Sequence, residues 1–177
     1  GDIWAVPEGT VVFPAEPLIT VRASLIEAQL LETMLLLLIN HQSLIATKAS
    51  RIVSAAKGRP VMEFGARRAH SIDAAVYGAR AAIIGGCVGT SCTLTAQKYN
   101  VPASGTMAHS FIQSFDSEYE AFKAYAENYP DDCTLLIDTY DSLGSGINNA
   151  IKVFDEVLTP MGCRPKAVRI DSGDLSY

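Results

Sequence analysis

Short apolar runs alternate with helical stretches from Arg59 to the end of the chain, and no other feature constrains the fold as strongly. The runs are PVMEF, CVG, VPASG, TLLID and KAVRID, at residues 60–64, 87–89, 101–105, 134–138 and 166–171. Alternation of this kind implies parallel strands covered by helices. The sequence therefore predicts an α/β fold, built either as part of an α/β barrel or as an open doubly wound sheet.

The part of the chain before Arg59 follows a different pattern. Residues 1–23 carry short β-branched runs between Pro-Glu-Gly and Pro-Ala-Glu-Pro turns, which are typical of a small β-rich element with three short strands. Ser24 and Glu27 predict a capping box that begins a long apolar helix, and we expect this helix to break near Asn40-His41. The expected domains are a β-rich element at 1–23, a long helical connection at 24–58 and a partial α/β barrel of about five βα units at 59–177.

Composition excludes several classes of protein. Hydrophobic residues make up 49% and charged residues 19%, which is typical of a globular chain. A net charge of −5 without a Lys/Arg cluster argues against nucleic-acid binding. The longest uninterrupted apolar run, 34–39, is far shorter than the roughly 20 residues of a membrane helix, so we expect no membrane association.

The cysteines and the chain ends lead to two further expectations. None of the four cysteines forms a CxxC pair, so their spacing predicts neither a zinc site nor a compact disulfide framework. We expect buried, reduced thiols in a cytoplasmic protein, and the first residues do not resemble a signal peptide. The sequence begins without methionine and stops just after a polar motif. We therefore expect an internal piece of a longer protein.

Polar residues follow the predicted strands, at the end where parallel α/β folds bind ligands. They are Arg67 and Arg68 after the first strand, His109 between hydroxyl residues after the third, Asp138 and Asp141 after the fourth, and Asp171 and Asp174 after the fifth. A turn, an N-cap or a surface ion pair would explain any one of them. Turn chemistry alone does not favour Arg, His and Asp together at the same end of successive strands, so we expect a site there.

Each residue type has a physical use at such a site. Arginine binds carboxylates or phosphates with two parallel hydrogen bonds, and aspartates at strand ends hold Mg²⁺ or sugar hydroxyls. A histidine among small residues leaves space for a phosphoryl group on one ring nitrogen. Together these residues predict a Mg²⁺-dependent enzyme that acts on a phosphorylated sugar and an anionic partner.

Four motifs in order give the chain a resemblance to a known family. EFGARRAH (63–70), GTMAHSF (105–111), LLIDTYD (135–141) and VRIDSGDL (168–175) resemble the motif set of nicotinate phosphoribosyltransferase, a type II phosphoribosyltransferase. The N-terminal strands and the long helix also resemble that family. The resemblance implies part of an irregular, TIM-like α/β barrel and a homodimer with shared active sites. It implies transfer of phosphoribosyl from phosphoribosyl pyrophosphate to nicotinate, coupled to ATP hydrolysis through a phosphohistidine, in NAD biosynthesis.

The resemblance also implies a role for each candidate residue. His109 would be the phosphohistidine, with Ser110 helping to hold the phosphoryl group, and Asp138 and Asp171 would serve the ribose, the pyrophosphate and Mg²⁺. The substrate-binding residues would be Phe64, stacked on the pyridine ring, Arg67 near the ring and the phosphate, and Thr106 and Arg169 at nicotinate, with Arg169 facing its carboxylate. Arg68, Asp141 and Asp174 would support this site from behind.

Alternatives remain within and beyond this family. Nicotinamide phosphoribosyltransferase places an aspartate before the histidine motif, whereas no acidic residue occurs between Gly85 and Gly105 here, which favours nicotinate. Quinolinate phosphoribosyltransferase needs more cationic residues and has no use for the histidine. A non-catalytic ligand-binding or dimerisation module is a different class of function. The family's N-terminal tyrosine segment and its glycine-rich 5′-phosphate site are absent, so we expect these 177 residues alone to be inactive.

Overall fold

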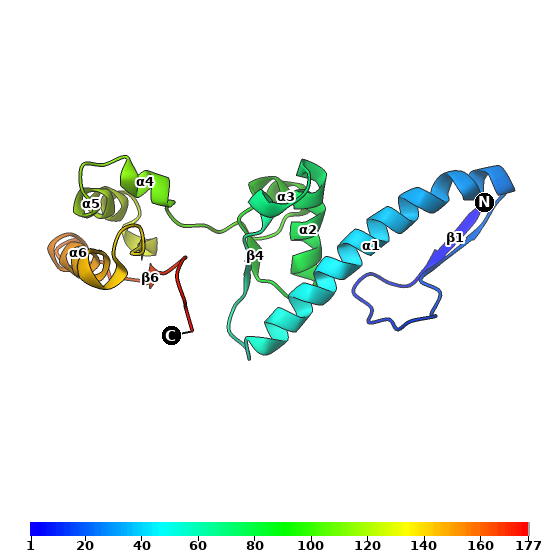
Figure 1. Ribbon diagram of the computed structural model, residues 1–177, viewed down its shortest axis with the longest axis horizontal. Coiled ribbons are helices and arrows are strands. Elements are labelled where there is room, and N and C mark those ends of the chain that lie inside the picture. The colour runs from blue at the N-terminus through cyan, green and yellow to red at the C-terminus, as the bar shows by residue number, and fades with distance from the viewer. Residues whose placement is uncertain (177) are drawn as a thin grey trace. The chain divides into compact units, whose positions relative to one another are not determined.

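The structure, a computed structural model, describes residues 1–176 as a mixed α/β chain in two compact units, Gly1–Gly105 and Thr106–Tyr177 (Figure 1). The boundary between the units lies inside the stretch expected to form the partial barrel. The described strands form three two-stranded sheets, which confirm the α/β class, and no barrel closes within the described residues. The division at residues 23 and 58 stays a prediction.

The first unit begins with an antiparallel pair, β1 (Asp2–Ala5) with β2 (Ile19–Arg22), where the sequence predicts three strands. Helix α1 (Leu25–Ala55) follows, and Ser24 and Glu27 form the predicted capping box. The unit is completed by β3 (Met62–Glu63), the short 3-10 helix η1 (Ala66–Arg68), α2 (Ile72–Ile84), β4 (Gly89–Thr90) and α3 (Thr93–Tyr99). β3 and β4 pair in parallel, as the strand–helix alternation predicts.

Helix α1 runs without interruption for 31 residues, so the predicted break near Asn40-His41 is wrong. The segment contains neither glycine nor proline, the residues that interrupt helices most strongly. The His41 ring finds a polar partner without leaving the helix, because its Nε2 lies 3.2 Å from the carbonyl oxygen of Ala74 on α2.

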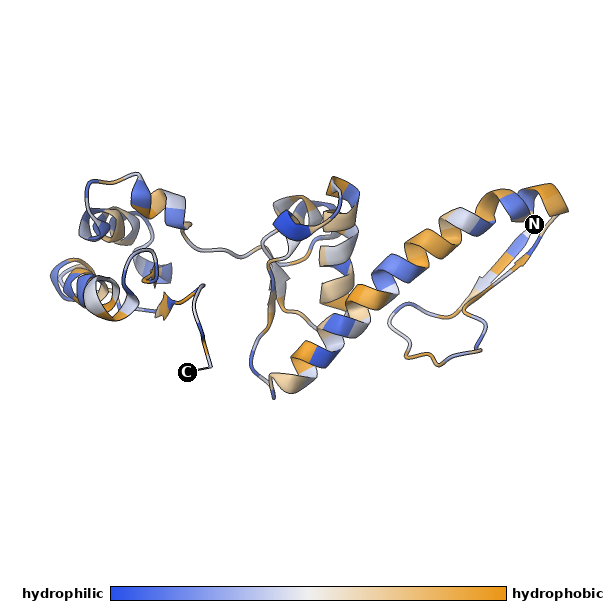
Figure 2. Ribbon diagram, in the orientation of Figure 1, coloured by the Kyte–Doolittle hydropathy of each residue, from blue (hydrophilic) through white to orange (hydrophobic). Residues whose placement is uncertain are grey.

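The apolar surface of α1 is largely exposed. Hydrophobic residues run along the whole helix in Figure 2, and Leu25, Ile26, Leu30 and Leu37 are each at least 66% exposed. By length and composition alone α1 could cross a membrane, and none of its most apolar window is buried in this structure. This property of α1 differs from the expectation of no membrane association, which was drawn from the short apolar run at 34–39. It is weak evidence, because the core helix of a soluble protein has it too.

The second unit has the larger core. Its elements are α4 (His109–Gln113), α5 (Glu118–Asn128), the 3-10 helix η2 (Pro130–Asp132), β5 (Thr134–Leu136), the π-helix η3 (Ser142–Gly146), α6 (Ile147–Val153), the π-helix η4 (Phe154–Leu158) and β6 (Ala167–Arg169). Fully buried side chains of Ile112, Phe122, Leu135 and Leu158 join the helices to β5. β5 and β6 pair in parallel, with Leu136 opposite Arg169. This pairing sets where the residues after each strand lie.

The predicted strand at 101–105 is only a single bridge, between Ala103 and Thr90. Pro102 has no N–H group to donate to a ladder, which limits the pairing of this segment. Its carbonyl oxygen still accepts a 3.0 Å hydrogen bond from the Thr90 N–H. The third βα unit is therefore reduced to an extended segment.

The four cysteines are free, as expected. Cys87 and Cys133 are buried, as expected, whereas Cys92 and Cys163 are partly exposed, which differs from the expectation. Burial raises the pKa of the Cys133 thiol to about 11, and the charge of Asp132 acts in the same direction. This thiol is thus protonated at neutral pH and unreactive.

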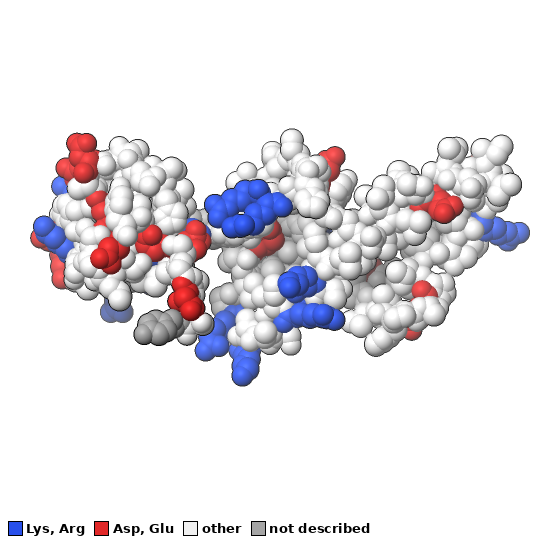
Figure 3. All heavy atoms as spheres, viewed as in Figure 1, with Lys and Arg blue, Asp and Glu red and all other residues white. Residues whose placement is uncertain are grey.

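The two units differ in charge. Gly1–Gly105 carries nine Lys and Arg against seven Asp and Glu, whereas Thr106–Tyr177 carries five against twelve. Figure 3 shows basic side chains gathered on the part of the first unit that contains α2 and α3. Acidic side chains predominate on the visible face of the second unit. Anionic ligand groups would therefore be favoured on the first unit, and cations on the second.

Candidate active site

The carboxyl ends of β5 and β6 bring two predicted aspartates together. Asp138 lies two residues beyond β5 and Asp171 two residues beyond β6. The Asp171 N–H donates a 2.8 Å hydrogen bond to Asp138 Oδ2, and the Ser172 hydroxyl donates a 2.6 Å bond to the same oxygen. Adjacent parallel strands end at one edge of a sheet, so this proximity follows from the pairing of β5 with β6.

His109, the first residue of α4, faces this edge. Its Nε2 lies 3.9 Å from Asp138 Oδ1 and 3.7 Å from Asp171 Oδ2. On the other side of the ring, Nδ1 lies 3.2 Å from the Thr139 hydroxyl oxygen. The side chain remains 37% exposed, so the ring is oriented on both sides and still open to a ligand.

Asp138 is the most deeply placed carboxylate of the cluster, with a side chain only 2% exposed. Burial, the largest single influence, raises its pKa. The Ser172 hydroxyl, the Asp171 N–H and the charge of His109 together outweigh burial and hold the pKa of Asp138 below its ordinary value. Its Oδ1 is buried without a hydrogen-bond partner in the described part of the chain. A buried oxygen of this kind is costly unless a ligand or cation engages it.

The lowered pKa of Asp138 predicts a pH dependence of stability. A carboxylate whose pKa is lower in the folded state stabilises that state above the unfolded pKa, here 3.8, and loses this contribution as pH falls through the folded value. We expect the free energy of unfolding to fall on acidification below about pH 4 more steeply in the wild type than in Asp138→Asn. Denaturant unfolding of both proteins at a series of pH values checks this. Equal slopes would contradict it.

Arg169, the last residue of β6, joins the cluster to the start of the unit. Its Nη1 donates a 2.7 Å hydrogen bond to Thr106 Oγ1, and its Nη2 donates a 2.5 Å bond to Asp171 Oδ1. The guanidinium group thus spans two predicted site residues. Arg169 and Asp171 do lie on the same side of the strand, as alternation predicts.

Other predicted residues of this unit have local contacts. Asp141 caps the turn η3, because its Oδ1 accepts hydrogen bonds from the N–H groups of Leu143 and Gly144. Asp174 Oδ1 accepts a hydrogen bond from the hydroxyl of Ser176. Ser110 follows His109 in α4 and is exposed. These hydrogen bonds of Asp141 and Asp174 are typical of turn residues, which is the alternative explanation that the sequence pattern leaves open.

The remaining predicted residues belong to the first unit. Phe64 follows β3 directly and is 38% exposed, and Arg67 and Arg68 form the short turn η1. A hollow of about 440 Å³ lies beside this turn, between α1 and α2. Its polar lining comes from Glu63, Arg68, His41 and His70, and small residues of α2 form the rest.

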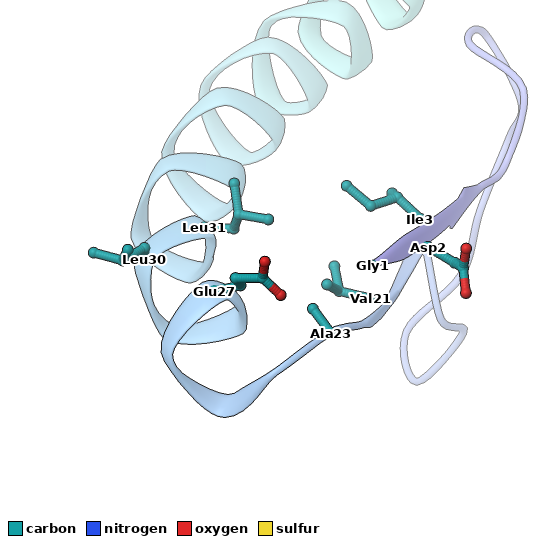
Figure 4. Close-up of a pocket in the computed structure, with 8 residues that line it drawn as sticks. All are labelled: Gly1, Asp2, Ile3, Val21, Ala23, Glu27, Leu30 and Leu31. Carbon is teal, nitrogen blue, oxygen red and sulfur yellow. The ribbon is translucent and has the colours of Figure 1, made fainter.

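A second hollow in the first unit, of about 320 Å³, lies between the β1–β2 pair and α1 (Figure 4). Ile3, Val21 and Leu31 line it with apolar side chains. Two carboxylates, Asp2 and Glu27, also line it, and Glu27 accepts hydrogen bonds from Ser24 as part of the helix cap.

Two residues of the cluster were missed from the sequence. Thr139 contacts the His109 ring, and Ser172 donates to Asp138. Each directly follows a predicted aspartate, in LLIDTYD and VRIDSGDL. A hydroxyl residue after a strand-end aspartate could have pointed to them, although the same pattern is common in turns.

The cluster provides part of a Mg²⁺ site. Residues 1–176 contain no group of three His, Cys, Asp or Glu side chains arranged to hold a metal. Mg²⁺ usually takes only one or two carboxylates from the protein and fills its remaining positions with substrate oxygens and water. Asp171 and Asp138, whose buried Oδ1 accepts no hydrogen bond from the described part of the chain, fit that share.

Comparison with protein families matches the model described as "Nicotinate phosphoribosyltransferase (NAPRTase) family" to residues 60–176. The chain is 53% identical over 175 residues to nicotinate phosphoribosyltransferase pncB2 of Mycobacterium tuberculosis, covering 99% of this chain and 37% of that protein. It is 49% identical over 177 residues to the Bacillus subtilis nicotinate phosphoribosyltransferase, covering 98% and 35%. The chain thus spans little more than a third of the length of these relatives.

Solved structures agree with the sequence comparison. The crystal structure of human nicotinic acid phosphoribosyltransferase superposes with a TM-score of 0.90 at 32% identity, covering 98% of this chain and 44% of the human one. The nicotinate-nucleotide pyrophosphorylase of Pyrococcus furiosus gives a TM-score of 0.60 at 33% identity over 75% of this chain and 33% of its own. With a matching family model over most of its length, this chain belongs to the nicotinate phosphoribosyltransferase family.

Proposed function

We propose that this chain carries the phosphohistidine and part of the substrate site of a nicotinate phosphoribosyltransferase. The enzyme would transfer phosphoribosyl from phosphoribosyl pyrophosphate to nicotinate, releasing nicotinate mononucleotide and pyrophosphate. The observation that carries the proposal is the His109 ring, held between Thr139 and the carboxylates of Asp138 and Asp171. Family membership and the activity for which the relatives are named support the same reaction.

The geometry supports Nδ1 of His109 as the atom that accepts the phosphoryl group of ATP. A histidine nucleophile needs a free lone pair on one nitrogen and a proton held on the other. Asp138 and Asp171 face Nε2 and favour its proton, so the Nδ1 lone pair accepts from the Thr139 hydroxyl until a phosphoryl group replaces that contact. The bond to the γ-phosphorus forms as the bond to ADP breaks, and water later releases phosphate from the ring.

Arg169 and Thr106 are proposed to bind nicotinate. The guanidinium carries the charge that a carboxylate requires, and Thr106 and Asp171 hold its two terminal nitrogens in place. Phe64 and Arg67 of the first unit would add the ring-stacking and phosphate contacts, with Ser110 near the phosphoryl group. Arg68, Asp141 and Asp174 would act through these residues.

Asp138 and Asp171 are proposed to hold Mg²⁺ together with pyrophosphate oxygens. The ion would supply positive charge to neutralise the leaving pyrophosphate. Without an ion, two carboxylates near the anionic substrate would oppose its binding. The buried Oδ1 of Asp138 accepts no hydrogen bond from any described residue, which leaves it available to such an ion and supports this assignment. The residues of the chain itself orient His109 and position the ribose.

A homodimer in the cytoplasm, without nucleic acid or a membrane as partner, completes the proposal. The exposed apolar face of α1 supports further protein contacts there, because contiguous apolar surface of this kind marks an interface. The free cysteines suit a reducing compartment. An irregular α/β barrel is the architecture we propose for the intact enzyme, of which the two parallel pairs would be parts.

Turnover assays on the intact enzyme test the proposed function. Purified protein is given phosphoribosyl pyrophosphate and Mg²⁺ with nicotinate or nicotinamide, with and without ATP, and the mononucleotide product is measured. We expect product from nicotinate and stimulation by ATP. Product from nicotinamide alone would identify the other transferase, and no product from either would favour a non-catalytic module.

A further inference from the structure

Glu63, the last residue of β3, ties together two turns of the first unit. Its Oε1 accepts a 2.5 Å hydrogen bond from the Gly65 N–H, and its Oε2 accepts a 2.6 Å bond from the Thr90 hydroxyl. Thr90 is fully buried and stands opposite Glu63 in the register of β3 and β4. The bond from the Thr90 hydroxyl is in the short range that is typical of a hydroxyl donating to a carboxylate.

The contact continues beyond Thr90. Its hydroxyl oxygen accepts a 2.9 Å hydrogen bond from the Cys92 N–H. The Glu63 carboxylate thus holds Gly65 and Thr90 directly and Cys92 through Thr90. The backbone pairing ends close by, with the Ser91 N–H donating to the Glu63 carbonyl oxygen at 3.0 Å. Beyond this point no backbone hydrogen bond joins the two turns in the described part of the chain, and the Glu63 side chain provides the contacts between them.

Glycine at position 65 leaves space for the Glu63 carboxylate. A Cβ atom at position 65 would lie 3.0 Å from Glu63 Oε1, closer than nearly all real Cβ contacts. A glycine therefore lets the carboxylate reach the backbone N–H. The turn held in this way contains Phe64 and leads into Arg67, the ring and phosphate residues of the proposed function.

We propose that Glu63 is a positioning residue for nicotinate, acting through Gly65 on the Phe64–Arg67 turn and through Thr90 on the Ser91–Cys92 turn. The inference rests on the proposed function. In this role the carboxylate acts on the two turns rather than on the substrate itself. It fixes the turn that carries Phe64 relative to the turn that begins α3, and a small displacement of a binding group is costly to affinity and rate.

The test uses the intact enzyme with Glu63→Ala, Thr90→Val and Thr90→Ser. Valine keeps the volume of threonine and removes the hydroxyl, whereas serine keeps the hydroxyl. We expect Glu63→Ala and Thr90→Val to raise the KM for nicotinate about tenfold or more, with a much smaller change in kcat. Thr90→Ser should remain close to the wild type, as should Glu127→Ala, which removes an exposed carboxylate of the second unit.

A second measurement does not depend on turnover. Hydrogen exchange at the amides of Gly65 and Cys92 should become faster in Glu63→Ala and in Thr90→Val. Glu63→Ala removes the acceptor of the Gly65 N–H and the partner of Thr90, whereas Thr90→Val removes the acceptor of the Cys92 N–H and the partner of Glu63. Unchanged exchange and an unchanged nicotinate KM in folded variants would overturn the inference. Equal losses in Thr90→Ser and Thr90→Val would assign the effect to packing and overturn it too. Absence of turnover in the wild type would instead refute the proposed function.

Discussion

His109→Ala is expected to abolish the incorporation of labelled phosphate from γ-labelled ATP into the intact enzyme. The side chain offers the Nδ1 lone pair between Thr139 and the two carboxylates, and alanine has no nucleophile to replace it. Turnover of nicotinate in the presence of ATP should fall to the rate that the wild type shows without ATP. The adduct in the wild type should be acid-labile and stable to base, as expected for a phosphoryl group on a ring nitrogen.

His70→Ala provides a matched control for this experiment. His70 is exposed in the first unit and belongs to no part of the proposed phosphoryl site. We expect it to retain the label and the stimulation by ATP. Label that survives in His109→Ala, or ATP stimulation that persists without label, would show that the ring has another role.

Arg169→Lys is expected to lower kcat/KM for nicotinate by about 10- to 100-fold. Lysine keeps the charge but cannot span Thr106 and Asp171 as the guanidinium does with Nη1 and Nη2. The loss should be specific to the carboxylate of the substrate. Any residual turnover of nicotinamide should therefore change much less, so that the preference for nicotinate over nicotinamide declines. Steady-state kinetics with both substrates measures the preference.

Arg164→Lys is the control for the same substitution outside the cluster. Arg164 lies in the exposed segment before β6 and has no place in the proposed site. Its kinetics should match the wild type. If Arg169→Lys lowered turnover of both pyridines equally, the arginine would act on phosphoribosyl pyrophosphate or on Asp171 rather than on the nicotinate carboxylate.

Local patterns predicted several elements because the decisive interactions lie close together in the chain. The capping box of Ser24 and Glu27 formed as expected, since both partners lie within one helical turn. The apolar runs that contain β5 and β6 were recognised from β-branched and apolar residues bounded by polar ones. The predicted break in α1 was wrong, because a contact between His41 and α2 satisfies a polar side chain that the sequence shows without its partner.

Sequence patterns pointed to the main residues of the candidate site but not to the residues that support them. His109, Asp138, Asp171 and Arg169 combine chemistry and position at strand ends, which a sequence displays. Thr139 and Ser172 do not, because a hydroxyl beside an aspartate is equally typical of a turn. Their contacts span 30 and 34 positions in the chain.

The sequence by itself determined the order of the motifs, the resemblance to a family and the end of the strands at which polar residues gather. Only the tertiary structure decided which of these groups meet. Arg169 reaches Thr106 across 63 positions, and Asp138 accepts from residues that follow a different strand. The physical reason is that the pairing of β5 with β6 and the packing of α4 are nonlocal. The stability of such contacts depends on partners that the local sequence does not contain.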